Sequence, residues 1–274
     1  MSARQVTSLT NPTVKAVRAL HLRKERDETG LFLAEGLKLV GEALDLGHTP
    51  RILLYGPEAA SLPILQKAMR ATLTAGGDVV EVNRDILEKI SRRDNPQTVI
   101  AVFPQVFHAL DSLEPSAADC WVALQAVRDP GNLGTIVRTA DAAGLGGVIL
   151  VGDCCDPYSV EAVRATMGSI FAVRLYQVGV EAFIAWRAGW TGAVVGTLLT
   201  ATQTHQQADY RRPVAAMNRG TRISPIRGLP RSYGPLLPSP GGNTGLRRCR
   251  KFTTSGAPQI EQPGLQNNDG RNRH

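Results

Sequence analysis

The chain has 274 residues, 43% of them apolar, and a formal net charge of +7 at pH 7. This length allows two modest domains, each with its own hydrophobic core. No apolar run approaches the ~20 residues needed to cross a bilayer, and the N-terminus lacks a charged-then-apolar signal, so we expect a cytoplasmic protein with no membrane partner.

The positive charge is concentrated in the last quarter of the chain. Residues 211–274 hold 12 Lys and Arg against two acidic residues, whereas residues 1–210 have a net charge of −3. The overall charge is therefore weak support for RNA binding by the folded part. The four cysteines form no CxxC pair and no metal-ligand spacing, so we expect free thiols and no metal site.

The first 110 residues alternate between helical and strand patterns, which predicts a small layered α/β domain. A basic helix opens at Asn11-Pro12 and runs through Leu22. It is followed by a strand at 31–33, a helix at 37–46, a strand at 51–55, a helix at 62–73, a strand at 78–82, a helix at 84–90 and a strand at 98–103. The polar stretch 111–119 is typical of a linker.

Residues 120–213 give a second α/β pattern, with nearly continuous apolar strands that indicate a buried parallel sheet. The predicted strands are Trp121–Val127, Gly147–Val151, Phe171–Tyr176 and Gly192–Thr197, and helices are predicted after Asn132, at Val160–Met167 and at Val180–Ala188. Gly144 precedes a strand, so we interpret it as a helix C-cap and not as part of a dinucleotide-binding loop.

The segment from Asp129 to Ala140 joins the first of these strands to a helix. Pro130 and Gly131 form a turn, and Asn132 stands where we expect the N-cap. Side chains lean toward the N-terminus of a helix, so Arg138 can approach Asn132 and the exposed N–H groups. This end of a strand is a usual place for ligand chemistry in an open α/β sheet.

The pattern Asn132-x-Gly134-x-x-x-Arg138-x-Ala140 resembles the first signature motif of the TrmH/SpoU branch of the SPOUT RNA methyltransferases. The segment Asp156–Phe171 resembles the second motif of that family, in the expected order and spacing. The resemblance implies a SPOUT-type sheet that forms a trefoil knot when complete, with S-adenosylmethionine as the cofactor. It also implies a homodimer that methylates a ribose 2′-hydroxyl of ribosomal or transfer RNA.

The same resemblance assigns roles to individual residues. Arg138 and Asn132 are the catalytic candidates, Arg138 as a cation that binds the adjacent phosphate and stabilises a developing alkoxide. The alternative for Arg138 is an ion pair with Asp141 or Asp129 on the helix surface. Gly196 and Thr197, at the end of a strand, are the cofactor-binding candidates. Glu161 and Arg164 lie three residues apart and could pair across one helical turn.

The patterns Asn11-Pro-x-Val-Lys15, Phe32-x-x-Glu35-Gly36 and Asn95-Pro-Gln-Thr98 are similar to the substrate-binding domain that precedes many catalytic domains of this family. The RNA-binding candidates are on or just after the basic first helix: Lys15, Arg18, Arg23 and Lys24. Arg92 and Arg93 form a second small basic patch. The alternative is an ordinary solvated helix face.

The last part of the chain departs from the family. Residues 213–274 contain 8 Pro and 9 Gly, a composition typical of disordered chain, and lack the third motif that completes the cofactor pocket. We therefore expect domains at 1–110 and 120–213 and a disordered or aberrant tail at 214–274. A shift of reading frame near Val214 is favoured over natural divergence. The predicted function is RNA 2′-O-methylation, impaired in this chain; the alternative is a non-catalytic RNA-binding protein that retains the fold.

Overall fold

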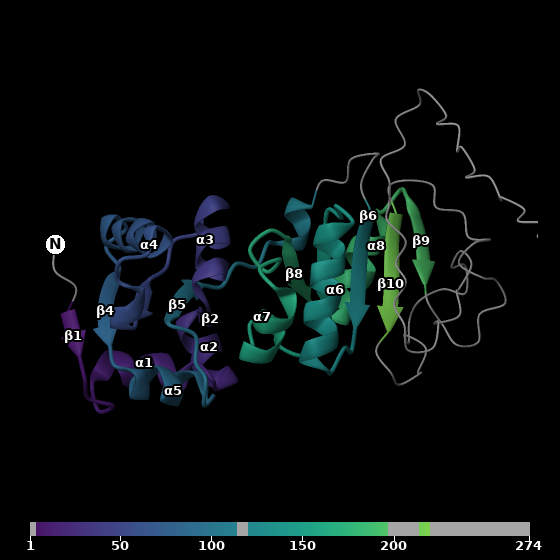
Figure 1. Cartoon of the computed structure of the whole chain (residues 1–274). Helices are drawn as coiled ribbons and strands as arrows, with labels where there is room; N and C mark the ends of the chain where they lie inside the picture. The colour runs from purple at the N-terminus through teal and green to yellow at the C-terminus, as the bar shows by residue number, and fades with distance from the viewer. Residues whose placement is uncertain (1–3, 114–119, 197–213, 220–274) are drawn as a thin grey trace, which may run out of the picture.

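Two five-stranded sheets, each flanked by helices, lie side by side in the computed structural model of the chain (Figure 1). The structure describes residues 4–113, 120–196 and 214–219. The α/β class predicted from the sequence is confirmed.

The first sheet is mixed. In spatial order its strands are β1 (Arg4–Val6), β4 (Asp78–Val82), β3 (Ile52–Tyr55), β5 (Val99–Pro104) and β2 (Leu31–Glu35). The pairs β1–β4 and β4–β3 are parallel, whereas β3–β5 and β5–β2 are antiparallel. The residues of β5 are buried from Val99 to Phe103, as expected for a strand that is covered on both faces.

Helices cover this sheet: α1 (Pro12–Ala19), α2 (Arg23–Thr29), α3 (Leu37–Asp45), α4 (Pro63–Thr74) and α5 (Arg84–Ser91), with a short 3₁₀ turn η1 (Pro57–Ala59). The single basic helix predicted from Asn11 to Leu22 is wrong at its end. The helix stops at Ala19, because Leu22 has an extended backbone and begins a new helix. The carbonyl of Leu20 then accepts a 2.7 Å hydrogen bond from Arg26 Nη1, which turns Arg26 inward.

The second sheet is entirely parallel, as predicted. Its spatial order is β8 (Leu175–Val178), β7 (Gly147–Val151), β6 (Cys120–Gln125), β10 (Val214–Arg219) and β9 (Ala193–Gly196). Strand β10 corrects the predicted tail, because it begins at Val214 and pairs with β6 and β9 inside the sheet. The short apolar run Val214–Met217 is sufficient to join a buried parallel sheet. Residues 220–274 lie outside the described residues.

The connections of this domain are α6 (Pro130–Ala142), α7 (Val160–Thr166) and α8 (Val180–Ala188), and a 3₁₀ turn, η2 (Leu110–Ser112), precedes β6. Gly144 has φ +62° directly after α6, which confirms its role at the helix end. The strand predicted at Phe171–Tyr176 begins only at Leu175. Residues before it form turns, with the N–H of Phe171 bonded to the carbonyl of Gly168.

The two domains share one aromatic core. Phe32 and Phe103 of the first sheet contact Phe171 of the second domain, with ring centroids 5.7 and 4.8 Å apart. The ring of Tyr158 lies against that of Phe32, with centroids 4.7 Å apart and the ring planes tilted by 40°. These rings are buried in a single hydrophobic cluster that includes residues of both sheets. Phe171 therefore belongs to the core that the two domains share, although its segment forms turns and not a strand.

Candidate functional site

The loop from β6 to α6 is held by a different cap from the one predicted. Asp129 is the N-cap, and its carboxylate accepts a 2.6 Å hydrogen bond from the N–H of Asn132. Pro130 takes the first helical position, where its fixed φ and missing N–H fit the helix start. Asn132 is therefore already in the first turn, and the prediction of its capping role is wrong. Its side chain is exposed and remains available to a ligand.

Arg138 lies further along the same helix and is exposed. Among the residues that the structure describes, it makes no ion pair, so the alternative of a surface pair with Asp141 or Asp129 is not realised. No hydrogen bond joins it to Asn132 within the same residues. Helix α6 thus presents a cation that carries no partner among the described side chains.

The glycine of the first motif serves the packing of α6 on α7. A Cβ added to Gly134 would lie 2.5 Å from the carbonyl oxygen of Ala162 and 2.5 Å from the Cβ of Ala165. Both obstacles belong to α7, and one is backbone, so neither can rotate away. The two motifs are therefore in direct contact through Gly134.

We expect Gly134→Ala to lower the free energy of unfolding by about 1–3 kcal/mol, because the added methyl forces the two helices apart. Thermal unfolding followed by circular dichroism measures the effect. Thr135→Ala, at the exposed next position, is the matched control and should stay within about 0.5 kcal/mol. Equal stability of Gly134→Ala and the parent would contradict the close packing.

The carboxyl ends of three parallel strands meet at one edge of the second sheet. By register, Gly196 at the end of β9 pairs with Met217 of β10, and Arg219 of β10 pairs with Gln125 at the end of β6. Gln125 Oε1 is buried and has no hydrogen-bond partner among the described residues. Of the two cofactor candidates, Gly196 is buried at this edge, and Thr197 lies outside the described residues.

The polar residues of the second motif fasten the two domains together. Asp156 accepts a 2.7 Å hydrogen bond from Arg26 Nε, and the two side chains are only 10% and 4% exposed. Arg164 Nη2 lies 2.8 Å from both carboxylate oxygens of Glu35 and also donates to the carbonyl of Ser91 at 3.0 Å. The predicted pairing of Arg164 with Glu161 is wrong, because the buried Glu35 offers it a less solvated partner.

Tyr158 adds a third link between the domains. Its hydroxyl donates to the carbonyl of Val106 at 2.7 Å and accepts from the N–H of the same residue at 2.9 Å. Burial raises the pKa of Tyr158 to about 12, so the hydroxyl stays protonated at neutral pH and acts as a structural donor.

The end of the second motif turns sharply. Thr166 is buried. Met167 has a left-handed backbone, with φ +52°, and its 63% exposure shows that it is not a core residue. Gly168 follows with φ +105°, and a Cβ there would meet Glu42 Oε2 at 2.3 Å. Met167, Arg164 and Arg93 line a cavity of about 360 Å³ between the two domains.

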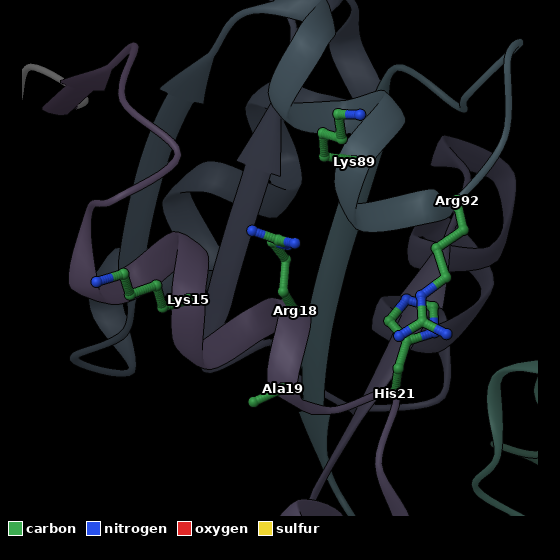
Figure 2. A pocket seen from close by; sticks show the side chains of 6 residues that line it. All are labelled: Lys15, Arg18, Ala19, His21, Lys89 and Arg92. Carbon is green, nitrogen blue, oxygen red and sulfur yellow. The ribbon is translucent and has the colours of Figure 1, made fainter.

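The RNA-binding candidates divide into two groups. Lys15 and Arg18 line a cavity of about 250 Å³ together with Ala19, His21, Lys89 and Arg92 (Figure 2). Arg23 and Lys24 are exposed on α2 and pair with the acidic residues four positions later, Asp27 and Glu28. His21 and Lys89 were not among the predicted RNA-binding residues. His21 lies two residues after the end of α1, whereas Lys89 belongs to α5, which packs against α1.

His21 connects the two helices that frame this cavity. Its Nε2 donates a 2.6 Å hydrogen bond to the carbonyl of Ile90 near the end of α5. Burial is the main cause that lowers the pKa of His21, and the nearby charges of Arg92 and Arg164 lower it further. The hydrogen bond to Ile90 and the charge of Glu35 act in the opposite direction. The neutral ring is therefore the favoured form in the folded protein.

A lowered pKa makes the folded state bind a proton less readily than the unfolded state. The contribution of His21 to stability is then complete above its unfolded pKa of about 6.5 and declines as the pH falls below that value. We expect the parent to lose more free energy of unfolding between pH 7.5 and pH 5.5 than His21→Gln, whose amide can still donate to Ile90. Denaturant titrations at both pH values measure the difference; equal losses would contradict it.

Two of the described cysteines are neighbours in the chain: Cys154 is a buried free thiol and Cys155 is a half-buried one. The thiol of Cys154 donates to the carbonyl of Leu124, and burial raises the pKa of Cys155 to about 11. In residues 4–113, 120–196 and 214–219, no group of His, Cys, Asp and Glu could hold a metal ion, and no helix is long and apolar enough to span a bilayer.

Comparison with known proteins adds family matches to both domains. Residues 11–101 match the MRM3-like substrate binding domain, and residues 119–217 match the SpoU rRNA Methylase family. An uncharacterized tRNA/rRNA methyltransferase of Synechocystis is 30% identical over 218 residues, which cover 76% of this chain and 75% of the relative. The 23S rRNA (guanosine(2553)-2′-O)-methyltransferase of Bacillus subtilis is 29% identical over 204 residues, 74% of this chain and 77% of that protein.

Solved structures agree with these matches. The AdoMet-bound rRNA methyltransferase from Sinorhizobium meliloti superposes with a TM-score of 0.77 at 44% identity, covering 89% of this chain and 91% of that one. The SpoU methyltransferase AviRb from Streptomyces viridochromogenes has a TM-score of 0.69 at 25% identity, covering 87% and 91% of the two chains.

Proposed function

Because this chain belongs to the SpoU rRNA Methylase family, we propose that it is built to transfer a methyl group from S-adenosylmethionine to a ribose 2′-hydroxyl of RNA. The Bacillus subtilis relative is a 23S rRNA 2′-O-methyltransferase, which favours ribosomal over transfer RNA as the substrate class. The observation that carries the proposal is Arg138, exposed and without an ion pair among the described residues, on the helix that follows β6.

The transfer forms a bond between the 2′-oxygen and the methyl carbon, breaks the carbon–sulfur bond of the donor and releases the hydroxyl proton. Negative charge grows on the 2′-oxygen as the proton leaves. A guanidinium group is a poor general base, so the role proposed for Arg138 is to bind a neighbouring phosphate and stabilise that charge. Asn132, exposed in the first turn of α6, can donate or accept a hydrogen bond beside it.

The sheet edge fits part of the cofactor site. Gly196 offers buried backbone without a side chain, and the buried Oε1 of Gln125 needs a donor such as the amine of an adenine. S-adenosylmethionine supplies the activated methyl group when bound. Gly196 and Gln125 would hold one side of it; the proposed role of Thr197 falls on a residue outside the described part of the chain.

We infer that this chain, as written, transfers methyl groups weakly or not at all. The family match ends at residue 217, two residues before the end of β10, and the Pro- and Gly-rich sequence that follows lacks the third motif. A shift of reading frame after residue 217 explains both facts better than one at Val214, since β10 belongs to the sheet.

The test is transfer of a labelled methyl group to rRNA by two proteins: the 274-residue chain, and a chimera in which residues 220–274 are replaced by the corresponding segment of the Sinorhizobium meliloti relative. We expect incorporation above background only with the chimera. A chimera that folds, binds RNA and transfers nothing would refute the proposed function, and equal transfer by both proteins would refute the impairment.

A second function, non-catalytic RNA binding, is favoured by the missing motif and by the cations of α1 and of the end of α5, which make no ion pair with the part of the chain that the structure describes. It predicts that the chimera binds RNA without methylating it. We also propose a homodimer in the cytoplasm, as the family resemblance implies. Light scattering on the chimera tests the dimer: a monomeric mass for an active chimera would exclude it.

A further inference from the structure

We propose that the cavity between α1 and α5 binds the phosphodiester backbone of the substrate RNA, and that it does so through Lys15, Arg18, Lys89 and Arg92. This inference deepens the proposed function, on which it rests, because it locates where the RNA is held. We call this cavity the α1–α5 groove.

The lining of the groove has one sign of charge. Four of the six residues that line it are Lys or Arg, and none is Asp or Glu. The other two are Ala19 and His21, and burial lowers the pKa of His21, which favours its neutral form. Lys15 and Arg18 are three residues apart on α1, so they stand on the same helix face. Lys89 lies on α5, and Arg92 is the residue that ends it. Figure 2 shows Lys15 and Arg18 on one helix and Lys89 and Arg92 at the other, around the same space.

These cations differ from most of their neighbours in having no acidic partner. Arg23, Lys24, Lys38 and Arg84 each pair with an acidic residue four positions later on their own helix. Among the described residues, none of the groove cations makes an ion pair. Glu88, the acidic residue next to Lys89, pairs with Arg84 instead, whose Nε donates to Glu88 Oε1 at 2.8 Å. Unpaired cations that face one space favour an anion with several charges, such as RNA.

The backbone conformation of Arg92 decides which substitution tests its charge. Arg92 ends α5 in the left-handed conformation, with φ +56°, where glycine or asparagine is the usual residue. An arginine tolerates this conformation only with strain. Glycine in place of Arg92 therefore removes the charge without adding backbone strain.

The groove is also tied to the second motif. Arg164 of α7 donates to the carbonyl of Ser91, the residue before Arg92, and His21 donates to the carbonyl of Ile90. Arg93, the residue after Arg92, lines the cavity between the two domains. RNA phosphates held by Arg92 would thus lie beside the contact that joins the substrate-binding domain to the catalytic domain.

The experiment measures binding of a fluorescein-labelled stem-loop RNA to the full 274-residue chain by anisotropy, at several salt concentrations. Two groove variants, Lys15→Ala/Arg18→Ala and Lys89→Ala/Arg92→Gly, are compared with Arg23→Ala/Lys24→Ala. All three remove two positive charges, and the basic C-terminal segment is the same in all, so only the position of the lost charge differs.

We expect each groove variant to weaken binding about tenfold or more and to reduce the slope of log K against log salt by about one per lost phosphate contact. The Arg23/Lys24 control should change less than about threefold, since those charges are paired and exposed. The single variant Arg92→Gly separates structure from binding: glycine relieves the backbone strain, so thermal stability should be kept while affinity falls.

Equal weakening by all three double variants would overturn the proposal, because position would then not matter. Absence of RNA binding by the parent chain would overturn it as well. The groove proposal and the proposed function can fail separately. If the groove variants lose RNA binding and the chimera transfers no methyl group, the groove proposal holds and the proposed function fails. If the chimera methylates RNA and the groove substitutions leave its KM for RNA unchanged, only the groove proposal fails.

Discussion

Arg138→Ala, introduced into the chimera with a restored C-terminal segment, lowers methyl transfer by about 100- to 1000-fold, the usual cost of removing a group that stabilises developing charge. The expectation follows from the position of Arg138 on α6 and from its lack of an ion pair among the described residues. Transfer of a labelled methyl group at saturating RNA measures the effect. The affinity for S-adenosylmethionine should be unchanged.

Arg128→Ala is the matched control, because Arg128 is an exposed arginine just before the same helix that pairs with Asp153 at 2.6 Å. It should lower transfer by no more than a few fold. Arg138→Lys should recover part of the activity, since lysine keeps the charge but loses the forked geometry. Activity of Arg138→Ala close to that of the parent would remove Arg138 from the mechanism.

Arg26→Ala is expected to destabilise the 274-residue chain by about 3–5 kcal/mol, a large fraction of the stability of most domains. The substitution leaves Asp156 as an uncompensated charge that is only 10% exposed, and it also removes the donor to the carbonyl of Leu20. Because the pair joins the two domains, the loss should appear in the unfolding of both. Urea titration followed by tryptophan fluorescence and circular dichroism measures it.

Arg23→Ala, three residues earlier on the same helix, breaks the exposed pair with Asp27 and should cost less than about 1 kcal/mol. Replacing both partners, as Arg26→Leu with Asp156→Leu, should recover much of the lost stability, because no buried charge remains. If Arg26→Ala unfolds at the same urea concentration as Arg23→Ala, the ion pair between Arg26 and Asp156 does not stabilise the contact between the two domains.

Local patterns in the sequence predicted most of the elements. The apolar run Gly147–Val151 and the period of Val180–Ala188 gave a strand and a helix with the observed bounds. Apolar runs and turn residues are local signals, and they act within a few positions of where they stand. The prediction of the N-cap of α6 was wrong because a local signal does not distinguish between two good capping residues. Asp129 and Asn132 are both suitable, and only the fold decides between them.

Contacts between distant segments were not predictable. Arg26 follows Arg23 and Lys24 and looks like one more cation of a basic helix, yet its partner Asp156 lies 130 positions away. Glu35 and Arg164 are joined across 129 positions, and His21 and Ile90 across 69. A single sequence shows which residues can pair but not which of them meet, so the division of the basic residues into paired and groove cations needed the structure.

The most direct measurement is calorimetric titration of S-adenosylmethionine into the 274-residue chain and into the chimera. The account predicts no measurable binding by the chain as written and micromolar binding by the chimera, because we propose that the family's segment after β10 completes the cofactor site. A folded chimera that fails to bind would contradict the assignment as a methyltransferase. Micromolar binding by the unmodified chain would contradict the loss of the site.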